Sequence, residues 1–251
     1  MSLLSSDAAL LLPGRALLRS GGKPLAARQG EGWEGALVSL EAVLAQAGKP
    51  GRLRVYLSHH FASLHLLPPP SVRLSAEEMA GWLQEHLVRD YGTEADAWRL
   101  AWQDAAPGRP VPVTAMPQAQ YDALHACLAD AGARLALLAP WFLPAWARHG
   151  RAAAPAGGKG WLVLAEPGRL ALACMERGRL HHLSLARLDD SAPAPDQIGA
   201  AVARQALLLG MESPARIAVL APDQTLEAGR PGAALAIHPL AGGIGWEGVL
   251  P

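Results

Sequence analysis

Hydrophobic residues along the chain recur either at every second position or at every third to fourth position, and the spacing changes often. Alternating or short continuous apolar runs predict strands, whereas apolar residues three or four positions apart predict helices. Strands are expected in 7–20 (two, separated by Pro13-Gly14), 23–30, 52–58, 61–70, 97–104, 111–117, 133–140, 161–165, 169–176, 179–187, 215–222 and 233–240. Helices are expected in 33–49, 74–92, 118–132, 141–150 and, after a short linker, within 192–210. The runs 133–140 and 215–222 are apolar enough to predict buried strands.

The helix predicted in "LSAEEMAGWLQEHLVRDYG" (74–92) carries signals at both ends. Ser75 is the expected N-cap, because its side-chain oxygen can accept a hydrogen bond from an amide of the first turn. Glu77 and Glu78 suit the positive end of the helix dipole. Gly92 is the expected stop.

The two halves of the chain repeat one order of elements. Each half begins with three strands, continues with a helix and reaches a buried strand, over 7–58 and over 161–220. Residues 60–140 add further strands and helices to the first half. No letter-by-letter repeat accompanies this order, so we interpret the duplication as architectural.

The same order predicts where the chain divides. "RAAAPAGGKG" (151–160) has the small, Gly- and Pro-rich composition of a linker. We therefore expect a first lobe over 1–150, with about 60–140 as an inserted small subdomain, and a second lobe over 151–251. A single unrelated α+β domain is the alternative.

Charge and cysteine usage narrow the function classes. The 251 residues include 22 Lys and Arg against 22 Asp and Glu, so no basic surplus favours nucleic acid. No stretch approaches the about 20 apolar residues of a membrane helix, and the start lacks the basic region of a signal peptide. Cys127 and Cys174 lie far apart without CxxC spacing, which is typical of buried thiols in a reducing compartment. We expect a soluble cytoplasmic chain without a membrane span of its own.

Three stretches resemble segments of the bacterial actin-like assembly proteins. They are "TAMPQAQYDALHACLADAGARLALLAP" (114–140), "LSAEEMAGWLQEHLVRDYG" (74–92) and "GWLVLAEPGRLALACMERGRLHHLSLAR" (160–187). The whole chain is similar in length and order to PilM of type IV pilus assembly and to the cytoplasmic domain of the type II secretion L protein, GspL. The resemblance implies an α/β fold of two duplicated actin-like, ribonuclease H-like lobes, with a small subdomain inserted in the first.

Nucleotide-binding members of this superfamily place Asp-x-Gly at the first hairpin of each lobe. The turn amides wrap phosphate there, and the carboxylate orients a metal and its waters. In the first lobe the only candidate is Asp7, which alanines follow in place of glycine. In the second lobe Ala165 takes the carboxylate position, Glu166 is one place off, and Pro167 removes an amide donor. Gly168 remains.

A third candidate segment lies near the C-terminus. "AGGIGWEG" (241–248), with Gly242 and Gly243, is either a remnant of the Gly-rich loop that grips adenosine or a flexible tail. The sequence contains no GxxxxGK[ST] motif. These departures predict a pseudo-nucleotidase with no cofactor and no catalytic residue. An active ATPase or kinase of the same superfamily is the alternative, and Mg-ATP binding that depends on Asp7 would reveal it.

The resemblance also implies a place in a bacterial type II secretion or type IV pilus machine. Such a protein is expected at the inner membrane, on the cytoplasmic side, where it links a secretion or pilus ATPase to inner-membrane platform proteins. A two-lobed α/β body offers sheet edges for peptide addition and needs no active-site carboxylate for that role. The degraded phosphate turns favour the secretion L protein over PilM. Formation of a homodimer stays open.

The histidine clusters do not predict a metal site. His59, His60 and His65, and likewise His181-His182, are expected on strands, where neighbouring side chains point to opposite faces. That spacing gathers no three ligands on one face. Edge or surface positions are the expectation for these histidines.

Nucleophilic chemistry is not indicated either. Cys127 and His125 are two positions apart on the predicted helix and therefore diverge, so we expect a packed thiol. In "PWFLPAW" (140–146), Trp141 and Trp146 are expected in the interior, with a surface for another protein as the alternative.

Overall fold

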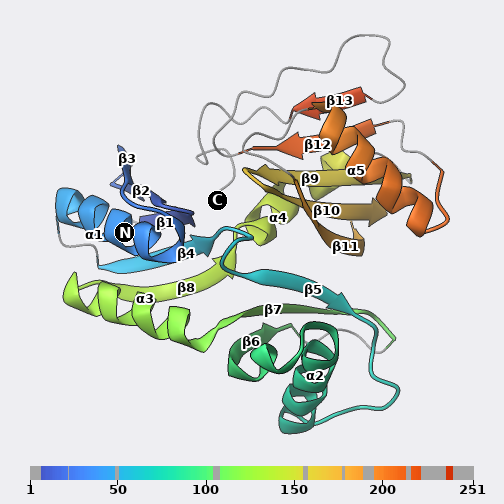
Figure 1. Ribbon diagram of the computed structural model, residues 1–251, viewed down its shortest axis with the longest axis horizontal. Helices are drawn as coiled ribbons and strands as arrows, with labels where there is room; N and C mark the ends of the chain where they lie inside the picture. The colour runs from blue at the N-terminus through green and yellow to red at the C-terminus, as the bar shows by residue number, and fades with distance from the viewer. Residues whose placement is uncertain are drawn as a thin grey trace, which may run out of the picture. The chain divides into compact units, whose positions relative to one another are not determined.

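The computed structural model (Figure 1) contains a counterpart for each predicted strand and helix. It describes residues 7–21, 23–48, 51–103, 108–154, 158–176, 179–188, 195–212, 216–221 and 236–239. The elements in chain order are β1 (Asp7–Leu12), β2 (Arg15–Ser20), β3 (Lys23–Arg28), α1 (Gly32–Ala47), β4 (Arg52–Leu57), β5 (Ser63–Leu67), α2 (Ala76–Tyr91), η1 (Thr93–Ala97), β6 (Trp98–Trp102), β7 (Val111–Pro117), α3 (Gln118–Asp130), β8 (Arg134–Pro140), α4 (Phe142–Ala153), β9 (Lys159–Glu166), β10 (Arg169–Glu176), β11 (Arg179–Arg187), α5 (Pro195–Leu208), β12 (Arg216–Leu220) and β13 (Ala236–Pro239).

The chain forms two compact units, Met1–Trp141 and Phe142–Pro251, and each contains a five-stranded sheet. The strand order is β3-β2-β1-β4-β8 in the first unit and β11-β10-β9-β12-β13 in the second. In both, three antiparallel strands are followed by two parallel ones. The predicted duplication is therefore confirmed, because the two sheets share one order and one set of strand directions.

One face of the first sheet forms a core with α1 and α3. Alternation along β1 and β2 turns Ala9, Leu11, Ala16 and Leu18 toward this core, where they are fully or almost fully buried. Leu40, 0% exposed, is one of the α1 residues packed against them. The second sheet packs in the same way against α5, through Leu170, Leu172 and Cys174 among others.

The inserted subdomain is narrower than the sequence predicted. It consists of a three-stranded antiparallel sheet, β5-β7-β6, with α2 and η1 beside it. The predicted insert also took in α3 and β8, but β8 pairs with β4 in the five-stranded sheet and α3 packs in that sheet's core. The hydrophobic pattern alone does not distinguish a strand of the insert from β8, which belongs to the sheet of the first lobe.

The division between the units lies before α4 rather than after it. The sequence placed 141–150 in the first lobe, whereas α4 packs on β9 and β12 of the second unit. The predicted linker 151–160 is largely ordered structure, because α4 continues to Ala153 and β9 begins at Lys159. A β-carbon on Gly160 would collide with the carbonyl of Ala153, so glycine serves close packing here rather than flexibility.

Candidate functional site

The first two strands of each five-stranded sheet form a hairpin that turns at Pro-Gly, and the two turns correspond residue by residue. In the first, Leu12 faces Arg15 across Pro13-Gly14, and in the second Glu166 faces Arg169 across Pro167-Gly168. The two glycines have φ of 66° and 73°. Proline at the first turn position and a positive φ at the second are the features of a type II turn, which favours glycine there. The tripeptide Pro-Gly-Arg stands at both turns, but it also occurs at 50–52 and 107–109, so strand register rather than the letters establishes the correspondence.

The correspondence corrects the position assigned to Asp7. This residue begins β1 at the end opposite the Pro-Gly turn and is in register with Leu53 of β4. Its Oδ1 accepts a hydrogen bond from the Gly21 amide at 3.3 Å. The first-unit counterpart of Glu166 is Leu12, which carries no carboxylate. Asp7 therefore lies away from the first turn, and that turn has no acidic residue immediately before its proline.

The first turn is closed by contacts with its own chain. The Gly14 amide donates to the carbonyl of Gly32 at 2.9 Å, and the Gly14 carbonyl accepts from the Gln29 amide at 3.0 Å and from Ser39 Oγ at 3.1 Å. Pro13 has no amide hydrogen. Neither residue of the turn therefore offers an amide donor to a phosphate.

The second turn keeps a carboxylate in an unusual setting. Glu166 is 0% exposed. Burial and then the charge of Arg187 lower the pKa of Arg169, while the charge of Glu166 acts in the opposite direction. The Gly168 carbonyl accepts from the Leu188 amide at 3.1 Å, which ties the turn to the end of β11. Gly242 and Gly243 lie outside the described residues.

The histidines do not converge on a metal. Among the residues that the structure describes, no three His, Cys, Asp or Glu side chains form a group that could hold a metal ion. His65 instead contacts Ser63 through Nε2 at 2.8 Å and Tyr91 Oη through Nδ1 at 3.3 Å. Burial lowers the pKa of His65 to about 4, although the charge of Asp90 acts in the opposite direction. His59 is 1% exposed, so the expectation of a surface histidine was wrong there.

The cysteines and one tryptophan are interior residues, as predicted. Cys127 and Cys174 are buried and unbridged. Burial raises the pKa of the Cys127 thiol to about 11, with contributions from Glu41 and Asp130. Trp141 is 1% exposed.

A groove of about 330 Å³ lies within the first unit. Its walls are β6, β7, the first turns of α3, and β8, and Figure 1 shows β7 running directly into α3. Lining residues include Arg99, Thr114, Tyr121, His125 and Leu137. Among the described strands, β6 hydrogen-bonds only to β7 and β8 only to β4, so each presents an outer edge. The groove is therefore bordered by an edge strand from each of two sheets, β6 and β8.

An arginine and two aromatic rings line the groove. The guanidinium carbon of Arg99 lies 4.0 Å from the centre of the Tyr121 ring, and the rings of Tyr121 and His125 are 4.5 Å apart. Leu137 on β8 is 43% exposed. Sequence reasoning missed this site because it interpreted 133–140 as a buried strand, whereas only Ala139 and Pro140 of β8 are buried. An apolar run in an edge strand looks the same as one in a buried strand.

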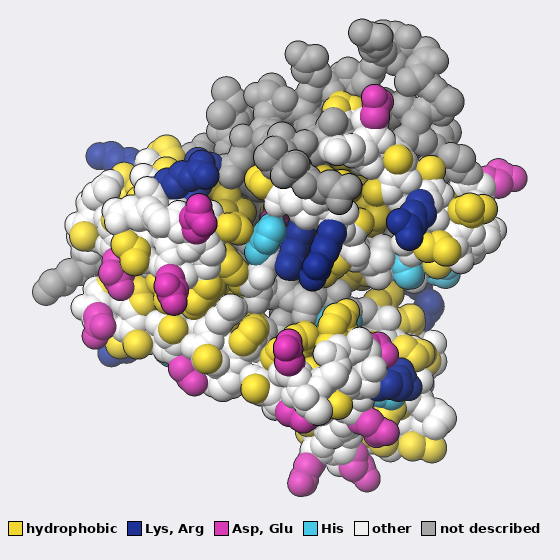
Figure 2. Space-filling view, in the orientation of Figure 1, with side chains coloured by type: hydrophobic (Ala, Val, Ile, Leu, Met, Phe, Trp, Pro, Cys, Tyr) yellow, Lys and Arg dark blue, Asp and Glu magenta, His cyan; other side chains and the backbone are white. Residues whose placement is uncertain are grey.

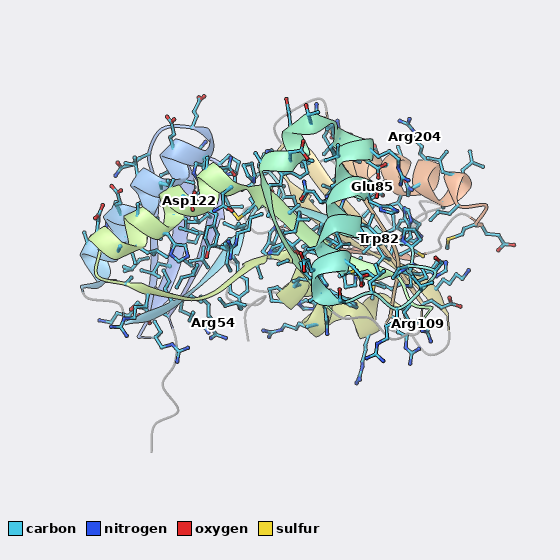
Figure 3. The ribbon with its side chains drawn as sticks, turned by 90° about the horizontal axis from the view of Figure 1, so that it is seen from below. Arg54, Trp82, Glu85, Arg109, Asp122 and Arg204 are labelled. Carbon is cyan, nitrogen blue, oxygen red and sulfur yellow. The ribbon has the colours of Figure 1, made fainter. Side chains whose placement is uncertain are left out.

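The insert outside the groove is acidic. Figure 2 shows acidic side chains gathered over α2, and Figure 3 places Trp82 and Glu85 on that helix. Trp82 packs against the core of the insert, while Glu85 is exposed. This surface disfavours a polyanionic partner at the insert.

Comparison with known proteins identifies the fold. No family model and no curated protein sequence matches the chain. Among solved structures, the chain is similar to the cytoplasmic domain of EpsL, an inner-membrane component of the type II secretion system of Vibrio cholerae, with a TM-score of 0.56 and 13% identity over 93% of this chain and 90% of that one. It is also similar to PilM in the PilM–PilN type IV pilus biogenesis complex, with a TM-score of 0.59 and 12% identity over 87% and 81%. A protein of unknown function with an actin-like ATPase fold from Bacteroides thetaiotaomicron gives 0.55 and 10% over 90% and 86%. The chain has the actin-like fold.

Proposed function

We propose that the chain is a non-catalytic actin-like scaffold of a type II secretion or type IV pilus platform. In this role it lies in the cytoplasm at the inner membrane and links the secretion or pilus ATPase to membrane components. None of the helices in the described ranges has the length and apolar content of a membrane crossing. The observation that carries the proposal is the groove of the first unit, bordered by two outer strand edges.

An extended peptide is the ligand form that this groove favours. The outer edge of β8 offers main-chain donors and acceptors, which an added strand satisfies, while alternate side chains of the ligand enter the groove. Leu137 and its apolar neighbours favour aliphatic side chains, and Arg99 favours an acidic residue beside them. The solved PilM structure is a complex with PilN, which supports a segment of an inner-membrane component as the occupant here.

The hairpin turns support a role without nucleotide hydrolysis. In the first unit the Gly14 amide is engaged by Gly32 and the residue before the proline is Leu12. Backbone amides and a metal-orienting carboxylate supply most of the stabilisation in phosphoryl transfer by such folds. The first turn of this chain offers neither an available amide at Gly14 nor a carboxylate at the position of Leu12.

A binding experiment tests the docking proposal. The purified chain is titrated with fluorescently labelled peptides from the cytoplasmic segments of the candidate membrane partners, and with the N-terminal domain of the candidate ATPase. The variant Leu137→Asp places a charge in the groove and should weaken binding of the cognate peptide by about tenfold or more. Val38→Asp is the matched control, because Val38 lies on α1 and is 44% exposed against 43% for Leu137.

The outcomes separate the alternatives. Binding that is lost in Leu137→Asp and kept in Val38→Asp supports the scaffold. Failure of all membrane-partner and ATPase baits to bind the wild-type chain would overturn it. Magnesium-dependent ATP turnover by the wild-type chain would instead favour the enzymatic members of the superfamily.

A further inference from the structure

The two most exposed large apolar side chains in the described part of the chain are neighbours on α5. Leu207 is 77% exposed and Leu208 is 69% exposed, and both lie in the last turn of the helix. The other large apolar side chains with high exposure lie singly at separate places in the fold. Single exposed apolar residues are normal on protein surfaces, whereas contiguous apolar surface marks interaction sites. The end of α5 therefore presents an apolar surface to solvent.

The rest of α5 divides into a buried side and an outer side. Ile198, Val202 and Ala206 recur every fourth position and pack against the second sheet, each at most 1% exposed. The residues on the opposite side of the helix are all exposed, and they are Asp196, Ala200, Arg204 and Leu207. Figure 3 shows Arg204 projecting outward from the helix. The outer side of α5 is therefore open to solvent along its length.

The outer side carries one charge of each sign, near opposite ends of the helix. Asp196 lies in the first turn, and Arg204 follows two turns later, about 12 Å along the axis. That separation is too long for an ion pair within one helix, where partners are three or four positions apart. The positions three and four residues from Arg204 hold only alanine and leucine. The two charges therefore do not compensate each other within α5.

We propose that the outer side of α5 pairs with α5 of a second copy of the chain, in antiparallel orientation. A two-fold axis across the helices sets the first turn of each α5 against the last turns of the other. Asp196 of each copy then meets Arg204 of the other, which forms two identical ion pairs, and Ala200 between them lets the helices approach closely. Leu207 and Leu208 leave solvent and pack against the facing helix.

The distribution of charge favours this occupant and this orientation. In an antiparallel pair of identical helices, the negative end of each faces the positive end of the other, so the surface is complementary to itself. A parallel pair would set Asp196 beside Asp196 and Arg204 beside Arg204, which like-charge repulsion disfavours. The dipoles of the two helices likewise attract only in the antiparallel arrangement.

The pairing should be weak and should depend on local concentration. One helix from each copy buries less than the about 1,600 Å² of a standard protein interface, so we expect a Kd of about 10–100 μM. Dimers of this affinity form mainly where copies are held close together. This inference goes beyond the docking role of the groove, because the groove belongs to the first unit and α5 to the second. Leu137→Asp, which weakens peptide docking, should leave self-association unchanged, so the two proposals can fail separately.

Sedimentation equilibrium of the full chain tests the proposal. The wild type should pass from monomer to dimer between about 5 and about 300 μM, a range that brackets the expected Kd. The double variant Leu207→Gln/Leu208→Gln should raise the Kd by about tenfold or more, because it removes apolar area from the interface. Val72→Gln is the matched control, since Val72 is 64% exposed but lies outside α5. It should dimerise as the wild type does.

Charge reversal tests the antiparallel arrangement. Asp196→Lys and Arg204→Glu should each self-associate about tenfold more weakly than the wild type, because each homodimer would contain two like-charge contacts. An equimolar mixture of the two variants should dimerise again, because both contacts then join opposite charges. Circular dichroism of each variant checks that the helical content is kept.

Three results would each overturn the proposal. They are a wild type that stays monomeric over the whole concentration range, equal self-association of the wild type and the double leucine variant, and a mixture of the charge variants that is no more dimeric than each variant alone.

Discussion

The carbonyl oxygen of Gly30 lies where a side chain at Gly14 would begin. A β-carbon at Gly14 would collide with this oxygen, and the φ of 66° at Gly14 disfavours any residue with a side chain. The close approach holds the end of the β3–α1 connection against the β1–β2 turn.

Substitution of Gly14 should therefore be costly. Gly14→Ala combines a positive φ with a backbone collision and should lower the free energy of unfolding by about 2–4 kcal/mol. Gly21→Ala is the control, since Gly21 has a φ of 54° but nothing within 4 Å of the added β-carbon. It should cost about 1 kcal/mol. Urea denaturation measures both, and equal losses would contradict the close approach.

The depressed pKa of His65 predicts loss of stability in mild acid. Because the folded pKa of about 4 lies below the ordinary histidine pKa of 6.5, the unfolded chain binds more protons between these values. Stability is therefore fully present above pH 6.5 and is lost as the pH falls toward 4. Protonation of His65 should lower the free energy of unfolding by about 2 kcal/mol, a figure discounted for the partial exposure of the side chain.

The variant His65→Gln tests this attribution. Gln keeps a donor and an acceptor for Ser63 and Tyr91 but does not titrate. Urea unfolding at pH 7 and at pH 4.5 should show a smaller difference in the variant than in the wild type. An unchanged difference would assign the acid sensitivity to other groups.

The buried thiols should resist alkylation in the native state. Burial raises the pKa of Cys127 to about 11 and also raises that of Cys174, so little thiolate forms near neutral pH. Iodoacetamide labelling followed by mass spectrometry should find both cysteines unmodified in buffer and modified in urea. Val72→Cys provides a reactive control, because Val72 is 64% exposed. Labelling of Cys127 as fast as of that control would contradict its burial.

The N-terminus of α2 is held by a capping box. Ser75 Oγ accepts from the Glu78 amide at 3.3 Å, and the Ser75 amide donates to Glu78 Oε2 at 2.7 Å, which lowers the pKa of Glu78. Ser75→Ala should cost about 1 kcal/mol of stability, whereas Ser75→Asp keeps the cap and should cost much less. Thermal melts of these variants, with Ser71→Ala as an exposed control, measure the effect. Equal melting temperatures for Ser75→Ala and Ser71→Ala would show that the cap contributes nothing.

Local signals in the sequence predicted the elements and the duplication well. Ser75 and Gly92 delimit α2 as expected, because caps and stops depend on a few neighbouring residues. The order of three strands, a helix and a strand appears in both sheets. The resemblance to PilM and GspL agrees with the structural comparison.

The pairing and register of the strands were harder to predict than the positions of the helices and strands along the chain. Asp7 was matched to a phosphate turn from its residue type, but register assigns that place to Leu12. The exposure of Leu137 likewise depends on which strand lies beside which. Strands that are distant in sequence determine these features, so the pattern of residues along the chain does not predict them.

The outer edges of β6 and β8 border one groove although the two strands belong to different sheets. A bound segment that paired with both would join the sheet of the insert to that of the lobe across the ligand's own backbone. The insert, which already contacts the lobe through Arg99 and Tyr121, would then gain a second connection to it while the partner is present. Tension on such a partner would be carried along a row of peptide hydrogen bonds, which resists pulling far better than a contact between a few side chains.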